Sequence, residues 1–408
     1  MQFCAAAAAD HRVSQNPVFE PSVGRLKPFH KIAAAWKSLP SPPLLRGWEW
    51  VVVTFIVSRL IIFGVMYLAR LEFGRGLYWH PGPMLTVLLQ FDAELWYIEI
   101  ARSGYNFSAN LPSSMGFFPF FPLLIRIASP LFTDIRIAAL VVAHVCFLLA
   151  GILMNALINL EFNDRRINRA AVMFLMFGPV SFFFSNAYSE STFLMLACAA
   201  FLAARQQKWL VASLCGACLS ATRNIGVLIA IPLVIEYLLH IWRSGFSWKA
   251  LLHPRILIFG IVPLGLAAFL FFGYWKFGDP FAYFKATAVW GRSFTFPQRT
   301  IANREALPVY LRWNNGGIFI AAFLIWVAGF FTRMRASYMV WTALLMIIYI
   351  CGSSLEGVPR YLSIAFPLFL ILGQITARFP SLTPPLLGGS VALLTIGAIL
   401  SAAGFWIT

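Results

Sequence analysis

Long apolar stretches, separated by short polar ones, follow one another from residue 48 to the end of the printed sequence. Runs of roughly 20 apolar residues are typical of helices that span a bilayer, because a helix satisfies its own backbone hydrogen bonds. The pattern predicts an all-α polytopic membrane protein with about eleven spans. These are expected at residues 48–70, 137–160, 170–187, 191–204, 209–222, 226–242, 256–275, 316–332, 337–352, 361–377 and 386–406.

Two apolar segments of the first large loop, residues 71–136, are predicted to be interfacial helices rather than spans. The segment 117–132 is short and contains three prolines and an arginine, which disfavour a membrane crossing. The segment 92–103 is expected to end at Gly104, because glycine readily takes the conformation that stops a helix. Residues 276–315 form the second large loop.

Composition agrees with this pattern, since 60% of the residues are hydrophobic and the mean hydropathy is +0.78. The net charge of +16 would suggest a nucleic-acid partner in a soluble protein. In a membrane protein it indicates basic cytoplasmic loops and contacts with anionic membrane lipids or phosphate, so no nucleic-acid partner is expected.

The positions of the basic residues predict the orientation of the chain. With the N-terminus in the cytoplasm, the cytoplasmic loops receive Arg165, Arg166, Arg169, Arg205, Lys208, Arg243, Lys249, Arg255, Arg333, Arg335 and Arg378. Residues 1–46 are then a basic, disordered cytoplasmic tail, and residues 47–408 form the transmembrane domain. The same orientation places both large loops and most carboxylates on the outer face.

Carboxylates are concentrated in the run FDAELWYIEIARSGY, residues 91–105. In an α-helix over residues 92–103, Asp92, Trp96 and Glu99 would share one face, and Glu94 would point elsewhere. Carboxylates at a membrane boundary are costly, which favours a functional role. An interfacial helix whose acids simply face water is an equally good interpretation of the spacing.

Three arginines, Arg223, Arg292 and Arg360, are predicted at the outer ends of spans. A guanidinium group there needs a partner, and a lipid phosphate matches its geometry. Snorkelling or pairing with an internal carboxylate such as Glu190 is the alternative. Tyr188 and Glu190, in the polar turn NAYSES, could contact substrate hydroxyls or simply form a hairpin. Histidine and cysteine show no metal-ligand spacing, so no cofactor is expected, although a divalent metal ion is not excluded.

Several motifs in order resemble the GPI mannosyltransferase II-like (PIG-V-like) family of GT-C membrane glycosyltransferases. They are FDAELWYIEIARSGY, GFFPFFPLLIRI, YSESTFLML, SATRNIGVLI, FGDPFAYFKATAVWGR and VPRYLSIAFPLFL, within residues 48–375. The resemblance implies a membrane enzyme that uses a polyprenyl-phosphate sugar, which is dolichyl-phosphate mannose in eukaryotic members. By motif match, the essential aspartate of the first outer loop is Asp92. The chain departs from the motif at Phe91, where tryptophan is usual, and at the additional carboxylate of Glu94.

The sequence therefore predicts an inverting glycosyltransferase, a mannosyltransferase that transfers sugar to a lipid or glycan acceptor on the extracytoplasmic face. Asp92 is the predicted catalytic base, and Arg223, Arg292 and Arg360 are the predicted ligands of the donor phosphate. Predicted substrate contacts are Glu94, Trp96, Glu99, Tyr105, Tyr188, Glu190, Asn224 and Tyr361. The alternative is a lipid-sugar flippase or transporter without transferase activity, which many spans with internal charges also fit.

Overall fold

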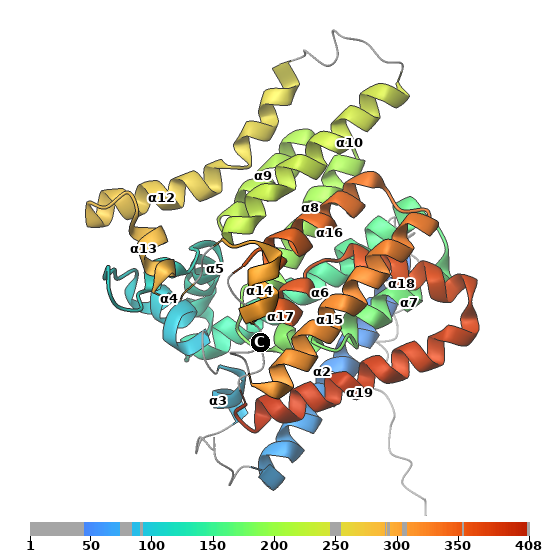
Figure 1. Ribbon diagram of the computed structural model, residues 1–408, viewed down its shortest axis with the longest axis horizontal. Coiled ribbons are helices and arrows are strands. Elements are labelled where there is room, and N and C mark those ends of the chain that lie inside the picture. Colours follow the sequence, from blue (N-terminus) through green and yellow to red (C-terminus); the bar gives the residue numbers. More distant parts are fainter. Residues whose placement is uncertain are drawn as a thin grey trace, which may run out of the picture. The chain divides into compact units, whose positions relative to one another are not determined.

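The computed structural model describes residues 45–73, 84–89, 93–244, 254–289, 291, 294–303, 308–352 and 355–405. Asp92, Arg292 and the predicted tail, apart from its last two residues, lie outside these ranges. The described chain is helical, and the strand pairing found in it is one antiparallel bridge between Phe294 and Gly352 (Figure 1). The predicted all-α class is confirmed.

Within the described residues, five helical segments are long and apolar enough to cross a membrane. They are Trp48–Phe73 (α2), Ile135–Glu161 (α6), Asn224–Arg243, Asn314–Phe331 and Pro380–Ala402. The last three contain α10 (Ala230–Arg243), most of α15 (Val309–Ala328) and α19 (Thr383–Ala402). A sixth span results if Arg255–Ile261 and α12 (Leu264–Phe277), which meet at a bend of 41°, cross together.

The count of about eleven spans is not confirmed, because the other predicted spans coincide with shorter helices. These are α7 (Arg165–Met176), α8 (Glu190–Arg205), α9 (Trp209–Ser220), α16 (Ala336–Ile350), α17 (Val358–Leu362) and α18 (Pro367–Arg378). The prediction of continuous helices over 170–187 and 361–377 is wrong. Proline explains both breaks, since Pro179 follows the end of α7 and Pro367 starts α18 after a turn, and proline cannot continue a preceding helix.

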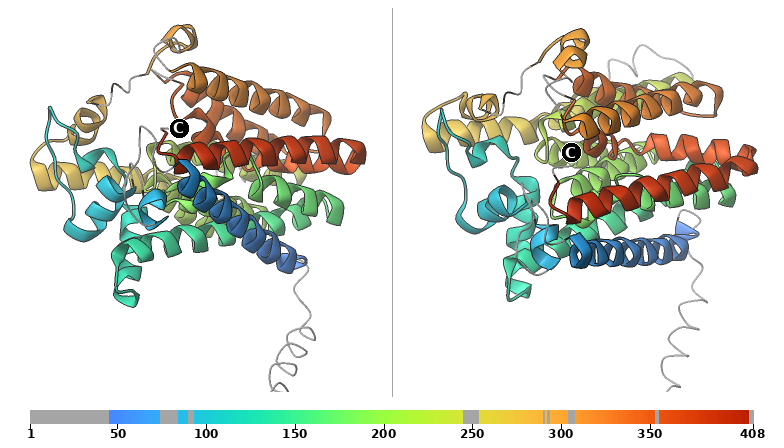
Figure 2. Two further views of the ribbon diagram at one scale, coloured as in Figure 1. Left: turned by 90° about the horizontal axis from the view of Figure 1, so that it is seen from below. Right: turned by 60° about the horizontal axis from the view of Figure 1, so that its bottom comes forward.

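Close helix packing forms the interior of the bundle, with α6 against α8, α18 against α7, and α2 against both α6 and α19 (Figure 2). Small residues permit the closest approaches, as is usual between membrane helices. A Cβ added to Gly373 of α18 would lie 2.7 Å from the carbonyl oxygen of Ile167 in α7. Arg59, buried in α2, donates to Ser181 Oγ at 2.7 Å and to Ser185 Oγ at 2.8 Å.

The first large loop folds into short helices: α3 (Met84–Leu88), a π-helix (Ala93–Ile98), α4 (Glu99–Ser103) and α5 (Phe120–Ala128). The helix expected over 92–103 is therefore partly a π-helix, and it ends as predicted at Gly104, whose φ is +85°. α5 is the short helix expected in the segment 117–132.

The two large loops pack on each other beside the bundle. Met115 and Phe118 of the first loop form a small core with Phe269 of α12 and Tyr283 of α13 (Ala282–Ala288). α12 and α13 accordingly reach out to the side of the molecule where α4 and α5 lie (Figure 1). This arrangement brings residues more than 150 positions apart into one face of the protein.

Four charged side chains form a network at the C-terminal end of α8, where the ends of several helices meet. Arg205, the last residue of α8, donates to Glu161, the last residue of α6, with Nε 2.5 Å from Oε1. Arg335, just before α16, donates to both oxygens of Glu236 in α10 at 2.8 and 2.9 Å, and its Nη1 lies 3.6 Å from Glu161. Two positive and two negative charges thus cancel within this network, which we call the Glu161–Glu236 network.

Candidate active site

Glu190, the first residue of α8, is completely buried and is the centre of a charged cluster. One of its oxygens, Oε1, accepts hydrogen bonds from Arg223 Nη1 at 2.5 Å and from Arg360 Nε at 2.6 Å. The other oxygen, Oε2, is buried and has no hydrogen-bond partner among the described residues. One carboxylate therefore holds two guanidinium groups and leaves an acceptor unused.

Aromatic rings complete the surroundings of both arginines. The guanidinium carbon of Arg360 lies 4.1 Å from the ring centre of Tyr188, and that of Arg223 lies 4.5 Å from the ring centre of Tyr361. The ring of Tyr349 in α16 stacks on Tyr361 at 4.7 Å. The hydroxyl of Tyr349 is buried without a hydrogen-bond partner among the described residues, so it is a second unused polar group near the arginines. Cation–π contacts fix the planes of the guanidinium groups.

Local backbone features explain how these side chains meet. Arg223 lies between the end of α9 and the 3-10 helix Asn224–Ile229, where the chain is extended and the side chain can turn toward α8. Arg360 belongs to the short helix α17, which begins after Gly357. Gly357 has a φ of +80°, and a Cβ there would lie 2.6 Å from a ring carbon of Tyr361. Glycine is thus required at this turn both by its φ and by the ring that packs on it.

The first large loop reaches this cluster through Tyr97. The Tyr97 hydroxyl lies 3.0 Å from Ser189 Oγ, next to Glu190, and both side chains are buried. Burial raises the pKa of Tyr97 to about 12, so the phenol is neutral near pH 7. Tyr97 lies in the π-helix that starts at Ala93, immediately after Asp92 in the sequence. The segment that follows the predicted catalytic base is therefore fastened to the start of α8.

We call this group the Glu190 cluster; its members are Tyr97, Tyr188, Ser189, Glu190, Arg223, Tyr349, Arg360 and Tyr361. Two guanidinium groups lie on one carboxylate oxygen in this cluster. Guanidinium groups match the oxygens of phosphate, so such a pair is suited to an anionic ligand. The free Glu190 oxygen and the Tyr349 hydroxyl offer further hydrogen bonds to a polar ligand.

Five of the residues singled out in the sequence meet in this cluster: Tyr188, Glu190, Arg223, Arg360 and Tyr361. Pairing of the arginines with Glu190, which the sequence left as an alternative to phosphate binding, is present for both. Phosphate binding by the same arginines is compatible with this pairing and stays a prediction. Sequence reasoning missed Tyr97, Ser189 and Tyr349, although Tyr97 and Ser189 stand next to selected residues.

Four other predicted substrate contacts have structural partners. Trp96 stacks on Phe117, at 5.2 Å between ring centres. Glu99 pairs with Arg102 at 3.3 Å, and both side chains are exposed.

The hydroxyl of Tyr105 donates to the carbonyl oxygen of Phe117 at 2.9 Å, and its ring packs on Phe269 of the loop core. The side chain of the exposed Asn224 accepts a hydrogen bond from the backbone of Ile225 at 2.9 Å. Glu94 is half-buried in the π-helix. These contacts support the loops around the Glu190 cluster, and substrate contact by the five residues stays a prediction.

The donor atoms of the Glu190 cluster do not fit a resident divalent metal ion. One carboxylate, already paired with two cations, stands among neutral phenols, whereas such ions prefer several carboxylate or carbonyl oxygens. Within the described residues no three His, Cys, Asp or Glu side chains gather in a possible metal site.

The fold places the chain in the GT-C class of membrane glycosyltransferases. It is similar to the crystal structure of ArnT from Cupriavidus metallidurans bound to undecaprenyl phosphate, with a TM-score of 0.51 and 14% identity. The similarity covers 87% of this chain and 76% of that chain. Residues 81–288 match the profile of the mannosyltransferase (PIG-V) family, and the chain belongs to that family. No curated protein sequence gives a match. The protein is thus a multi-pass membrane glycosyltransferase, and the resemblance noted in the sequence is confirmed.

Proposed function

We propose that the protein is an inverting mannosyltransferase that takes mannose from a polyprenyl-phosphate donor. The acceptor is a hydroxyl group of a lipid or glycan on the extracytoplasmic face. The observation that carries the proposal is the pair of arginines oriented by Glu190, beside the loop segment that follows Asp92. Membership of the mannosyltransferase family and the undecaprenyl phosphate bound to ArnT support the sugar and the class of donor.

The reaction replaces one bond of the anomeric carbon by another. The acceptor oxygen attacks this carbon from the side opposite the phosphate, its proton passes to a carboxylate, and the bond to the phosphate oxygen breaks. Asp92 is the proposed base, because a carboxylate within hydrogen-bond reach can take the proton as the attack proceeds. The electron pair of the broken bond stays on the polyprenyl phosphate.

The arginines stabilise the negative charge that develops on the leaving phosphate. Arg223 and Arg360 are already oriented by Glu190 and by the rings of Tyr361 and Tyr188, so little reorganisation accompanies the reaction. Arg292 is proposed as a third phosphate ligand from the second large loop. The free oxygen of Glu190 is proposed to accept a hydrogen bond from a sugar hydroxyl, and Tyr349 to donate one to the phosphate.

We infer the membrane side of the candidate site from the positions of the Glu190 cluster and the Glu161–Glu236 network. Glu190 and Arg205 start and end α8, which places the Glu190 cluster and the Glu161–Glu236 network about 22 Å apart along the helix. The predicted cytoplasmic arginines Arg205 and Arg335 belong to the network. With the basic end in the cytoplasm, the Glu190 cluster and both large loops lie on the outer face.

The decisive experiment is sugar transfer by purified protein in detergent, with polyprenyl-phosphate mannose and membrane lipid extract as acceptor. An enzyme forms mannosylated product without a membrane, whereas a flippase or transporter has nothing to move and forms none. The Asp92→Asn variant should lose about 10²–10⁴-fold in rate. Glu94→Gln is the matched control, and its effect should be much smaller. Near-normal turnover by Asp92→Asn would remove Asp92 from the mechanism.

Metal dependence is tested in the same assay. The donor set of the cluster predicts that a chelator leaves the rate unchanged, because the arginines carry the phosphate charge. A rate that falls with chelator and returns with a divalent cation would show that a metal ion shares this role.

A further inference from the structure

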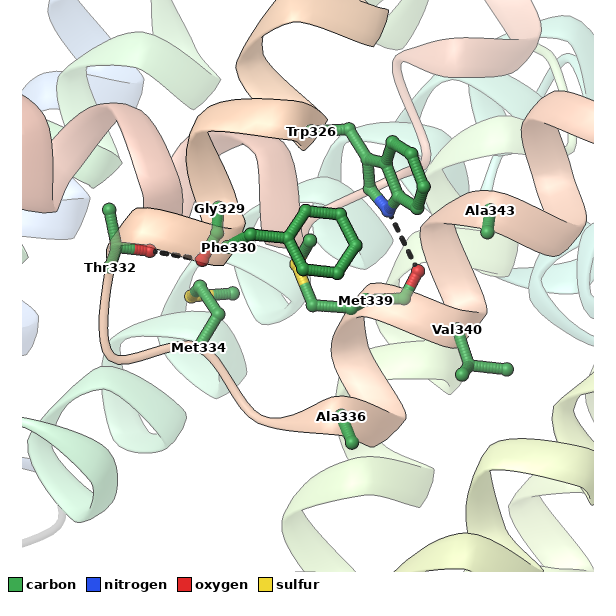
Figure 3. A pocket seen from close by; sticks show the side chains of 9 residues that line it. All are labelled: Trp326, Gly329, Phe330, Thr332, Met334, Ala336, Met339, Val340 and Ala343. Atoms are coloured by element: carbon green, nitrogen blue, oxygen red, sulfur yellow. Dashed lines mark hydrogen bonds between the residues drawn. The ribbon is translucent and has the colours of Figure 1, made fainter.

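A groove of about 340 Å³ lies between α15 and α16 (Figure 3). One wall carries Trp326 and Phe330, the other carries Met339, Val340 and Ala343, and the loop with Thr332, Met334 and Ala336 closes the end. Trp326 donates its indole hydrogen to the carbonyl oxygen of Met339 at 3.0 Å, which ties the two walls together. The lining is therefore apolar, and its polar groups are already used.

The groove faces outward, at the end of the bundle that holds the Glu161–Glu236 network. Phe330 and Phe331, at its edge, are 62% and 81% exposed, so this surface is suited to hydrocarbon rather than water. The loop 332–335 that closes the groove also carries Arg335 of the network. The groove thus opens into the membrane near the boundary that we propose to be cytoplasmic.

Two exposed arginines stand at the closed end. Arg333 belongs to the closing loop, and its backbone nitrogen donates to Gln374 Oε1 of α18 at 3.0 Å. Gln374 also donates to Met334 Sδ at 3.0 Å, and Arg378 follows it by one turn on the same face of α18. Neither Arg333 nor Arg378 forms an ion pair with a carboxylate of the described residues, whereas Arg335 is neutralised by Glu236.

We propose that this groove binds one anionic phospholipid, with an acyl chain between α15 and α16 and the phosphate at Arg333 and Arg378. The apolar walls alone would not select a ligand, because any lipid tail is as apolar as the groove. Selection comes from the two arginines, which attract an anionic headgroup at the membrane surface. Preference over a zwitterionic lipid should be on the order of tenfold.

The test is photo-crosslinking in lipid discs of phosphatidylcholine that contain a small fraction of phosphatidylglycerol with a diazirine in its acyl chain. Labelled peptides are identified by mass spectrometry. We expect labelling to concentrate on the peptides that span residues 326–343. Unlabelled phosphatidylglycerol should suppress this labelling at about a tenth of the phosphatidylcholine concentration. Labelling spread evenly over all exposed helices, or equal competition by both lipids, would overturn the proposal.

Variants test the apolar walls of the groove and the two arginines separately. Val340→Trp and the milder Ala343→Leu fill the groove and should reduce labelling of 326–343 several-fold, while Leu393→Trp, on the exposed face of α19, should not. The double variant Arg333→Gln, Arg378→Gln should keep the labelling and lose the preference for phosphatidylglycerol. Unchanged preference in this variant contradicts the role of the arginines. Residues 326–343 left unlabelled in discs that hold two copies of the chain would show that a second copy covers the groove.

Discussion

Replacing Arg360 by lysine separates a phosphate ligand from a mere counter-ion of Glu190. Arg360 donates Nε to Glu190 at 2.6 Å, and its guanidinium carbon lies 4.1 Å from the ring centre of Tyr188. Lysine keeps the positive charge and can pair with Glu190. Its compact ammonium group cannot reproduce the planar set of donors, so the contact with phosphate is the one that is lost.

The expected loss follows from the number of charged hydrogen bonds to the donor. One such bond contributes about 1.5–3 kcal/mol, so kcat/KM for the donor should fall by about one to two orders of magnitude in Arg360→Lys. Arg360→Ala should lose more, since it also leaves Glu190 with Arg223 alone. Breaking one side of a buried pair costs about 3–5 kcal/mol of stability, so the alanine variant must be compared at equal folded protein.

Arg335→Lys is the matched control. Arg335 is half-buried, with 13% of its side chain exposed against 6% for Arg360, and it also pairs with a buried glutamate. Both lysine variants should lower the melting temperature by similar amounts. The assay is the initial rate of mannose transfer against donor concentration, together with a thermal melt of each variant.

Two results would refute this reasoning. If kcat/KM for the donor is the same in wild type and in Arg360→Lys, Arg360 has a structural role only. Phosphate binding would then be the role of Arg223 and Arg292. An equal loss of kcat/KM in Arg335→Lys would show that any weakened buried pair impairs the enzyme.

Three further predictions concern the turn at Gly357, the phenol of Tyr97 and the orientation of the chain. Gly357→Ala should lower kcat/KM for the donor, since its Cβ would lie 2.6 Å from Tyr361 and displace the ring beneath Arg223. Tyr97→Phe should reduce the rate less than tenfold, for one lost neutral hydrogen bond of about 1 kcal/mol, and should leave the pH–rate profile near neutrality unchanged, because the pKa of Tyr97 is about 12. An exposed cysteine in Arg166→Cys should react with an impermeant maleimide from the cytoplasmic side alone.

Each of these has a control. Gly278→Ala imposes the same backbone strain, at a φ of +69°, but its Cβ meets nothing within 4 Å, so it should cost stability and leave donor use unchanged. A shifted alkaline limb in Tyr97→Phe would show that this phenol titrates during turnover. Leu111→Cys, in the first large loop and 64% exposed, should react from the outside, and the opposite pair of results would invert the proposed orientation.

The fold class could be predicted because apolar runs of membrane length are a strong signal, and every predicted span contains a helix. The helix lengths could not be predicted. Hydropathy averages over breaks such as Gly178-Pro179, where the composition stays apolar while the backbone can no longer continue the helix. The number of helices of membrane length therefore differs from the predicted number of spans, although the positions of the helices agree with the prediction.

The core of the candidate site was predictable for a physical reason. Glu190, Arg223 and Arg360 are charges in apolar surroundings, and burying them is possible only if they meet one another or a charged ligand. Tyr349 was not predictable, because a tyrosine within an apolar run looks like any core aromatic residue until its neighbours are known.

The helix type behind the helical-face argument for Trp96 and Glu99 could not be predicted. It assumed α-helical spacing, whereas residues 93–98 form a π-helix, whose wider turn places successive side chains at other angles. Glu99, the first residue of the α-helix that follows, pairs with Arg102 on the surface.

The two arginines of the Glu190 cluster also bear on how the proposed reaction ends. The proposed donor is a phosphodiester with one negative charge, whereas the polyprenyl phosphate left after transfer would be a monoester with about −1.5 to −2 charges near pH 7. The same two arginines should therefore hold the spent carrier lipid more firmly than the donor, and its departure should limit turnover. Added polyprenyl phosphate should then compete with the donor at concentrations below the donor KM. Rapid recycling of the carrier lipid by the cell should therefore also increase the turnover rate of the enzyme.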